Sequence, residues 1–162
     1  MTLLDAAVHV AALVLAVAGV AKLTDPRPVT RSLAAAGLPS SPLVGRLIGT
    51  GEVVVGGGAL AVGGRLAAVA LGAWYVAFVV YLVSNRLRGL DVPCGCIGES
   101  DRPAGPAHLV VDLLAGTVAF AAVARPVAGA ADWLDEGGLG IAVLVAIVAI
   151  SAAIVTLVLR ER

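Results

Sequence analysis

The stretch Leu139–Leu159 (LGIAVLVAIVAISAAIVTLVL) contains 21 consecutive residues without a charged side chain. A helix needs about 20 predominantly apolar residues to cross the hydrocarbon core of a bilayer. The rest of the chain is similar: of 162 residues, 60% are hydrophobic and 14% are charged, and the mean hydropathy is +1.03. Soluble domains carry about 25% charged residues. The composition therefore predicts an integral membrane protein with the lipid bilayer as its partner, and excludes an ordinary soluble enzyme or nucleic-acid-binding protein.

Four further apolar stretches precede this one, and each is close to the length that a membrane span requires. They are Leu3–Ala21, Leu43–Val62, Leu66–Ser84 and Ala107–Ala124. The short turn Gly63-Gly64-Arg65 predicts that the second and third spans form an antiparallel hairpin. We therefore expect an all-α fold, a polytopic transmembrane helix bundle. Residues 1–125 would form a four-helix core, and residues 126–162 would add an interfacial linker and a fifth, C-terminal span.

Basic side chains are distributed unevenly between the two ends of the predicted spans. Two of the eleven, Arg65 and Arg125, fall at one end, and nine fall at the other. Because cytoplasmic loops carry the excess of Lys and Arg, this asymmetry predicts an N-terminus outside the cell and a cytoplasmic C-terminus. Segments 22–42 and 85–106 should lie on the same face, since two spans separate them. The nine residues are Lys22, Arg27, Arg31, Arg46, Arg86, Arg88, Arg102, Arg160 and Arg162.

The two cysteines of the chain, Cys94 and Cys96, are separated by one glycine in the sequence DVPCGCIG, residues 91–98. Residues at this spacing have Cα atoms about 5.5–6.6 Å apart, within the range that a disulfide spans. Gly95 permits the unusual backbone angles that so tight a ring requires. Such a disulfide closes almost no loop and adds little stability, whereas strain and exposure make it labile and oxidising. The pattern favours redox exchange over a structural cross-link.

Metal binding is the competing interpretation of the cysteine pair. Zinc is usually held by four ligands, and the nearest further candidate is His108, twelve residues after Cys96. The other histidine, His9, begins the first predicted span on the opposite face. The chain thus offers no complete metal site on one face. A site shared between two copies of the chain, or a pair of inert thiols, are the remaining alternatives.

Several ionisable residues are predicted within or beside the spans. Glu52 lies near the middle of the second span, where a carboxylate is costly and usually functional or paired. We expect it to be protonated, or paired with Lys22 or Arg46. His108 and Asp112 begin the fourth span on the face of the cysteine loop, so they should lie near the thiols. A cationic neighbour there would increase the thiolate fraction of a cysteine.

Small and aromatic residues predict how the spans pack. Gly45 and Gly49 form a small-xxx-small pair in the second span, which lets helix backbones approach closely. Trp74, Phe78 and Tyr81 have helical spacing on one face of the third span. We interpret this aromatic face as packing core rather than as a cofactor site.

Three segments of the chain resemble the methylamine utilisation protein MauE family, itself similar to DoxX-like four-helix membrane proteins. The resemblance covers residues 1–125, and Ile97 stands where a phenylalanine is usual. It implies a multi-pass protein of a bacterial cell membrane that assists maturation of a disulfide-rich periplasmic methylamine dehydrogenase subunit, beside a thioredoxin-like partner. The segments are Ala18-Gly19-Val20-Ala21-Lys22-Leu23, Gly49-Thr50-Gly51-Glu52 and Pro93-Cys94-Gly95-Cys96-Ile97-Gly98.

From the residues and the resemblance together we expect a membrane thiol-redox protein that exchanges electrons with a thioredoxin-fold partner. Cys94 and Cys96 would be the redox pair, and Glu52 would handle protons. A quinone or another electron acceptor could take up the electrons, and nothing in the sequence identifies its site. One alternative is a non-catalytic membrane scaffold or assembly factor. A weaker one is a small-solute transporter, because the chain shows no inverted repeats or broken helices. The supporting residues would be Lys22, Arg46, His108 and Asp112.

Overall fold

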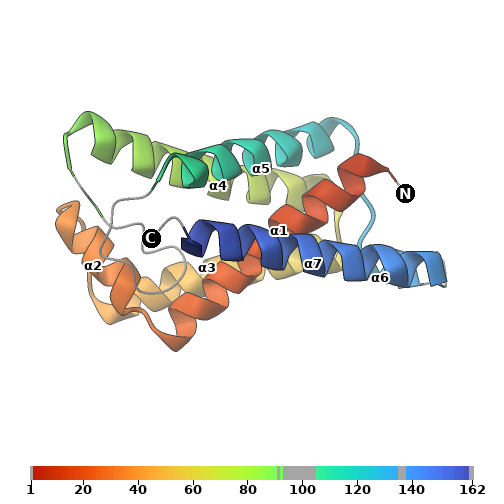
Figure 1. Ribbon diagram of the computed structural model, residues 1–162, viewed down its shortest axis with the longest axis horizontal. Helices are drawn as coiled ribbons and strands as arrows, with labels where there is room; N and C mark the ends of the chain where they lie inside the picture. Colours follow the sequence, from red (N-terminus) through yellow and green to blue (C-terminus); the bar gives the residue numbers. More distant parts are fainter. Residues whose placement is uncertain (1, 91, 93–104, 135–137, 161–162) are drawn as a thin grey trace.

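The computed structural model describes residues 2–90, 92, 105–134 and 138–160, and within them it contains helices and no strand. The all-α prediction is therefore confirmed for the described part of the chain. Figure 1 shows the helices running along the long axis of the molecule. They are α1 (Leu3–Thr24), α2 (Arg27–Ala35), α3 (Pro42–Ala61), α4 (Gly64–Leu87), α5 (Pro106–Ala124), α6 (Ala130–Leu134) and α7 (Gly138–Arg160).

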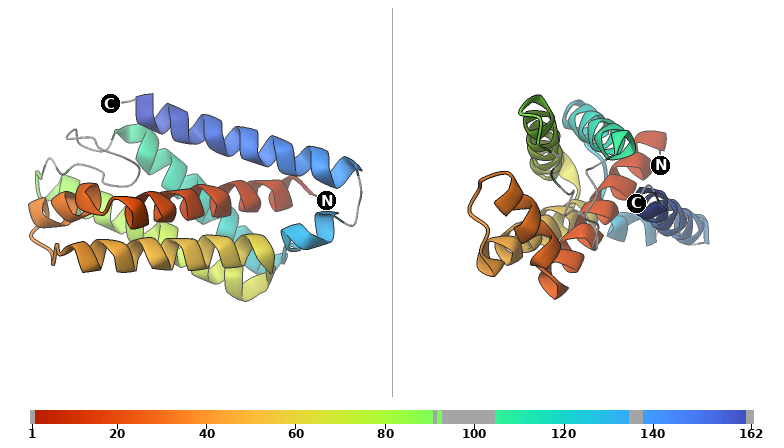
Figure 2. Two further views of the ribbon diagram at one scale, coloured as in Figure 1. Left: turned by 90° about the horizontal axis from the view of Figure 1, so that it is seen from below. Right: turned by 60° about the vertical axis from the view of Figure 1, so that its left-hand side comes forward.

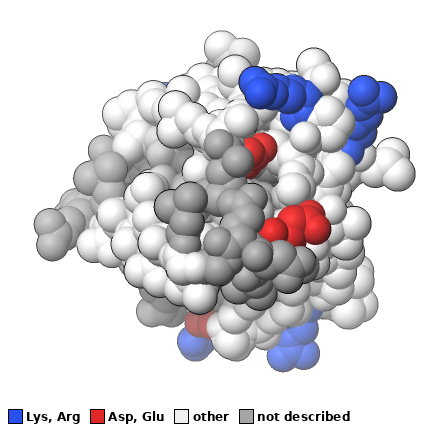
Figure 3. All heavy atoms as spheres, turned by 90° about the vertical axis from the view of Figure 1, so that its right-hand side faces the viewer, with Lys and Arg blue, Asp and Glu red and all other residues white. Residues whose placement is uncertain are grey.

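Four of these helices, α1, α3, α4 and α5, are long and apolar enough to cross a membrane. Large apolar side chains cover much of the outer surface, among them Leu3, Leu66 and Leu87, each more than 80% exposed. The end of the bundle near the N-terminus shows both basic and acidic side chains among uncharged atoms (Figure 3). The exposed apolar side chains along the long helices suit contact with lipid rather than water. The chain is thus a polytopic helical membrane bundle.

The fifth predicted span corresponds to α7, a helix of 23 residues. It lies along the outside of the bundle next to α1 (Figure 2). Between Gly140 and Thr156 it is an apolar helix of the kind expected in a membrane, although this stretch is shorter than the four spans. That α7 crosses the bilayer stays a prediction.

Helix ends follow local sequence signals. Thr2 caps α1 by accepting a hydrogen bond from the Asp5 backbone, while the Asp5 side chain accepts one from the Thr2 backbone. The Ser41 side chain caps α3 by accepting a hydrogen bond from the Val44 amide. Pro42 lies in the first turn of α3, where a backbone N–H would have no acceptor within the helix, so the absence of one costs nothing. At its other end, α1 runs to Thr24, three residues beyond the predicted end of the first span.

The predicted turn between the second and third spans is present, but the packing around it differs from a simple hairpin. Gly63 and Gly64 both have positive φ angles, +62° and +81°, which glycine adopts without strain. The Gly64 amide donates to the carbonyl of Val127 over 2.9 Å, so the turn is held by the segment after α5. Although the turn joins them directly, α3 packs mainly on α1, and α4 packs mainly on α5.

The contact between α1 and α3 depends on residues without side chains. A Cβ atom at Gly19 would lie 2.6 Å from the carbonyl oxygen of Gly49, and one at Gly49 would lie 2.8 Å from that of Gly19. Further along, a Cβ at Gly56 would lie 2.6 Å from the carbonyl oxygen of Ala12. Close packing was predicted for Gly45 and Gly49. It is confirmed at Gly49, whereas Gly45 packs against the side chains of Pro26 and Val29.

Aromatic side chains of α4 join the two helix pairs. Tyr75 is the buried one, and its hydroxyl donates to the carbonyl of Ala11 in α1 over 2.7 Å. Trp74 and Phe78 are half-buried and pack at the edge of the core, in agreement with the predicted packing role. Tyr81 reaches α2 instead, where its hydroxyl lies 2.7 Å from Ser32 Oγ.

The end of the bundle opposite the N-terminus, which we call the α2 end, gathers α2, the start of α3 and the end of α4 (Figure 1). Besides the Tyr81 contact, Arg88 donates from Nη1 to the carbonyl of Ala36 over 3.2 Å. Residues of segments 22–42 and 85–90 are therefore in direct contact. This confirms, for the described residues, that the two connecting segments lie at the same end of the bundle.

Candidate functional site

A buried ion pair joins α1 and α3. The Lys22 Nζ atom lies 2.9 Å from Glu52 Oε1 and 2.9 Å from Glu52 Oε2. The Glu52 side chain is 0% exposed and that of Lys22 is 4% exposed. Of the two basic residues predicted as partners of the carboxylate, the structure pairs it with Lys22. Glu52 is therefore an ion-paired interior residue rather than a lipid-facing one.

Glycine positions explain why these two side chains meet. Gly19 precedes Lys22 by about one turn of α1, and Gly49 precedes Glu52 by about one turn of α3. At the crossing, a Cβ on Gly49 would lie 2.9 Å from the Lys22 Cβ, and one on Gly19 would lie 2.8 Å from the Glu52 Cβ. Lys22 therefore lies beside Gly49 and Glu52 beside Gly19, and the two glycines leave the space in which the charged side chains meet.

The buried surroundings of the Lys22–Glu52 pair strengthen the attraction between its charges, and they also impose a free-energy cost for removing both charges from water. Removing two charges from water costs several kcal/mol per ion, which only good geometry and further polar contacts offset. Here the ammonium contacts both carboxylate oxygens, and its Nζ also lies 5.9 Å from the centre of the Phe78 ring. A cation over an aromatic face gains further electrostatic attraction. The pair is thus held from α1, α3 and α4 together.

Arg46, the other predicted partner, lies apart from this pair. It is exposed on α3, six residues before Glu52. Six residues correspond to 600° of helix rotation at 3.6 residues per turn, so the two side chains leave α3 on different faces. The structure therefore does not bring Arg46 to the ion pair.

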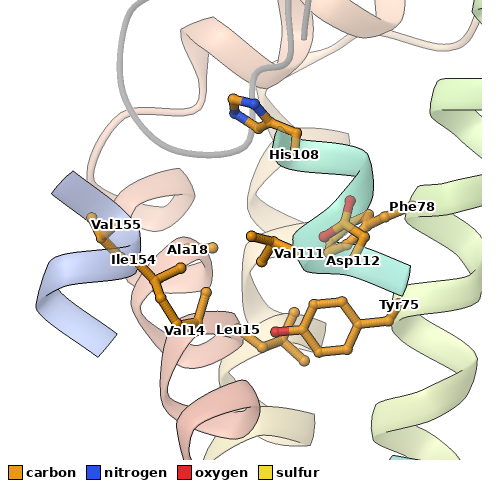
Figure 4. Close-up of a pocket in the computed structure, with 10 residues that line it drawn as sticks. All are labelled: Val14, Leu15, Ala18, Tyr75, Phe78, His108, Val111, Asp112, Ile154 and Val155. Carbon is orange, nitrogen blue, oxygen red and sulfur yellow. The ribbon is translucent and has the colours of Figure 1, made fainter. Parts of the chain in front are cut away.

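His108 and Asp112 lie in the first two turns of α5, and Figure 4 shows the His108 ring above the cavity, pointing away from Tyr75. Four residues apart, they share one face of the helix. Both line a small cavity of about 40 Å³, together with Phe78 and Tyr75 of α4. Lys22 Nζ lies 5.9 Å from the centre of the Phe78 ring, so the ion pair and this cavity share one side chain of α4. Four of the predicted site residues are thereby gathered around α4.

The sequence of the chain matches a known protein family. A family model described as Methylamine utilisation protein MauE matches residues 1–131. The chain belongs to the MauE family. The match includes α1 to α5, both cysteines and the Lys22–Glu52 pair, whereas α7 lies beyond it. No curated protein and no solved structure matches the chain.

Cys94 and Cys96 of this MauE-family protein lie outside the residues that the structure describes. The chain is described up to Leu90 and at Val92, which is buried, and again from Gly105 at the start of α5. The cysteines therefore belong to the connection between the end of α4 and the start of α5. Contact between the thiols and the four gathered residues stays a prediction.

Metal binding was the competing interpretation of the cysteines. Within the described ranges, no three side chains among His, Cys, Asp and Glu are grouped as a metal site requires. His9 is far along α1 from Lys22, near the N-terminal end, where its ring stacks on Trp133 with centroids 4.1 Å apart. Its Nδ1 contacts the Asp5 carbonyl oxygen over 2.8 Å.

Two parts of the site were missed by reasoning from the sequence. Tyr75 was not singled out, although its hydroxyl bond to α1 fixes the wall of the cavity beside Asp112. The contact between Ser32 and Tyr81, 49 residues apart, was also missed. One signal was present: Tyr81 lies seven residues after Trp74, two turns along the same face of α4.

Proposed function

We propose that this MauE-family protein is an integral membrane thiol–disulfide exchange protein whose redox pair is Cys94 and Cys96. The observation that carries the proposal is the spacing of these cysteines by one residue, inside the region that the family model matches. They belong to the connection between α4 and α5, and we expect Lys22 of α1 and His108 of α5 to lie near them. Polar groups in an otherwise apolar bundle support a chemical role for that end.

The exchange would proceed through a mixed disulfide. One cysteine thiolate attacks a disulfide sulfur of the partner, forms a bond to it and releases the second partner sulfur as a thiolate. The other cysteine of this chain, as a thiolate, then attacks the first and displaces the remaining partner sulfur. The partner disulfide is reduced to two thiols, and Cys94 and Cys96 are oxidised to a disulfide. The same steps run in reverse when this chain supplies the disulfide.

A proton acceptor is needed because each attacking thiol must lose its proton. We propose that Glu52, paired with Lys22, performs this role, with His108 and Asp112 as supporting groups. The described contacts give this route its support: Lys22 touches both Glu52 and the Phe78 ring, and Phe78 lines the cavity of Asp112. Glu52→Gln should then slow exchange and change its dependence on pH. An unchanged pH profile in that variant would reduce Glu52 to a structural residue.

The proposed partner is a thioredoxin-fold protein, and trapping tests it. With Cys94→Ser or Cys96→Ser, one of the two variants should accumulate a mixed disulfide, because the thiol that resolves it is absent. The covalent complex is detected on a non-reducing gel and its partner is identified by mass spectrometry. The double variant is the matched control and should trap nothing. Equal trapping by the double variant would show that capture does not involve this pair.

The redox state of the pair provides the decisive test. Membranes are alkylated with a maleimide before and after reduction, and the mass added to the chain is measured. The proposal expects alkylation at Cys94 and Cys96 to increase after reduction. If both thiols are fully alkylated under every redox condition, the pair is not redox-active, and a scaffold or assembly role replaces the proposed one.

A further inference from the structure

A second cavity lies beneath α2, separate from the cavity that His108 and Asp112 line. Its volume is about 220 Å³, and side chains from α1 to α4 form its walls. Lys22 closes it on the side of α1, Ser32 and Leu33 on the side of α2, and Ile48 on the side of α3. The α4 wall consists mainly of aromatic side chains. The Lys22–Glu52 pair therefore lies at the edge of a space large enough for part of a small molecule.

The walls combine flat apolar surface with a few polar groups. Trp74, Phe78 and Tyr81 line the cavity from one face of α4. The polar groups on its walls are the hydroxyls of Ser32 and Tyr81, 2.7 Å apart, and the ammonium of Lys22. Each already has a partner, since Tyr81 also donates to the Ser32 carbonyl over 3.1 Å and Lys22 pairs with Glu52, so a ligand would share these groups. Hydroxyl and ammonium groups all donate hydrogen bonds. Ligand sites are typically apolar cavities with a small number of placed polar groups, and this one favours a planar ring that carries hydrogen-bond acceptors.

The cavity opens on the side of the bundle. Ala77, which lines it, is exposed, and Ile48 and Trp74 are half-exposed. The neighbouring outer positions are apolar and exposed as well, Leu47 on α3 and Val80 on α4. In a chain whose spans α3 and α4 face lipid here, a ligand would enter from the bilayer. The ligand should therefore carry a lipid-soluble tail as well as a ring.

We propose that this cavity binds the ring of a membrane-soluble quinone. A quinone combines a planar ring and an apolar tail, which match the aromatic wall and the lateral opening. Its carbonyl acceptors would share the Lys22 ammonium with Glu52 or join the hydrogen-bonded hydroxyls of Ser32 and Tyr81. Oxidation of the Cys94–Cys96 dithiol to a disulfide releases two electrons and two protons, and a quinone that takes up both becomes a quinol. This redox step rests on the proposed function, whereas binding of the ring does not.

Tryptophan fluorescence gives a direct test, because quinones quench a tryptophan that they contact. The chain has two tryptophans, Trp74 in the cavity and Trp133, which is 2% exposed near the N-terminal end. In the Trp133→Phe variant, reconstituted into nanodiscs free of quinone, decylubiquinone should quench Trp74 saturably at one molecule per chain. A photoreactive azidoquinone provides a second measurement on the unaltered chain and should label α2 and α4.

A matched pair of variants separates binding from collision in the bilayer. Ala77→Leu adds a side chain inside the cavity and should weaken saturable binding about tenfold or more, because the space for the ring is filled. Ala73→Leu adds the same side chain one turn earlier, at an exposed position that does not line the cavity, and should leave binding unchanged. Equal effects of the two variants, or quenching that never saturates, would overturn the proposal.

A control ligand tests the chemistry of the ring. Decylbenzene has the same tail and a planar ring but no carbonyl groups, so it should displace the azidoquinone far less well than decylubiquinone does. Equal displacement would mean that the cavity accepts any apolar chain, and the quinone proposal would fail. The Cys94→Ser/Cys96→Ser double variant should bind quinone normally. Loss of quinone binding and loss of thiol exchange are therefore detected independently.

Discussion

The Lys22 ammonium lies 2.9 Å from each carboxylate oxygen of Glu52, although thirty residues separate the two along the chain. Neither side chain is more than 4% exposed, so the two opposite charges meet almost entirely out of contact with solvent. The pair joins α1 and α3 at the point where Gly19 and Gly49 bring the two backbones together. Glycine packing and an ionic contact thus act at the same crossing of these helices.

The first prediction concerns the free energy of unfolding. Lys22→Met and Glu52→Gln should each lower it by about 3 kcal/mol, because breaking a buried pair leaves one partner uncompensated. The double variant should lose clearly less than the sum, since no charge is left behind. Reversible unfolding in detergent, followed by circular dichroism, measures all three. Additive losses would mean that the two groups do not interact in the folded protein.

The second prediction concerns the glycines of α3. Gly49→Ala should destabilise the bundle by about 2 kcal/mol, because the added Cβ would meet the Gly19 carbonyl oxygen at 2.8 Å and force the helices apart. Gly57→Ala is the matched control, as nothing lies within 4 Å of a Cβ there. It should be neutral or stabilising by up to about 1 kcal/mol, since alanine favours a helix over glycine. Similar melting temperatures for the two variants would contradict this account of the α1–α3 contact.

The third prediction concerns Asp25, which follows the end of α1. Hydrogen bonds from the Arg27 guanidinium, 2.8 Å long at both carboxylate oxygens, lower the pKa of this carboxyl from 3.8 to about 2. Because the folded pKa is the lower one, the associated stabilisation is complete above pH 3.8 and is lost as the pH falls through about 2. The exposed position of the pair makes its effect on stability small.

Carbon-detected NMR of Asp25 checks this pKa directly. In Arg27→Ala the titration midpoint should return toward 3.8, since the hydrogen bonds from Arg27 are the largest cause of the shift. Arg31→Ala should move it only slightly, because Arg31 acts through charge alone and is the last of the causes. If Asp25 titrates at the same pH with and without Arg27, the contact does not persist in the membrane protein.

The fourth prediction concerns topology. A reporter fused after Arg162 should lie in the cytoplasm, because nine of the eleven basic residues fall at the end of the spans where α7 also ends. The same rule places Cys94 and Cys96 in the cytoplasm, whereas the family resemblance implies service to periplasmic disulfides. We follow the charge count, since it acts most strongly in short loops near span ends. Labelling of intact cells by an impermeant maleimide only after reduction would reverse this orientation.

The spans were readable from the sequence because hydropathy and breaker residues set their limits. The first span was predicted from Leu3 to Ala21, and α1 extends to Thr24, just before Asp25 and Pro26. The sequence did not predict which helices would be neighbours in the bundle. In a membrane helix every face is apolar, so periodicity does not show which face meets a partner. The turn at Gly63 suggested that α3 would pack on α4, whereas the close approaches of Gly49 to Gly19 and of Gly56 to Ala12 direct it to α1.

The candidate site could be predicted only in part, because the sequence shows which residues need a partner but not where the helices cross. A carboxylate in the middle of a span demands a partner, which indicated Lys22 or Arg46 for Glu52. Choosing between them needed the crossing point of α1 and α3, which depends on contacts between backbones far apart in the chain. The cavity beneath α2 depends likewise on Ser32 meeting Tyr81, a contact 49 residues apart that no local pattern specifies.

The ion pair also bears on how the chain enters the membrane during synthesis. Of the four long spans, α3 has the lowest mean hydropathy and carries Glu52 at its centre. A carboxylate in that place costs about 3 kcal/mol when such a helix partitions into lipid by itself. Lys22 is synthesised thirty residues before Glu52, so the cation reaches the translocon before the anion does. This order of the charges along the polypeptide lets α3 insert with Glu52 beside its counter-ion Lys22, instead of carrying an isolated carboxylate into the bilayer.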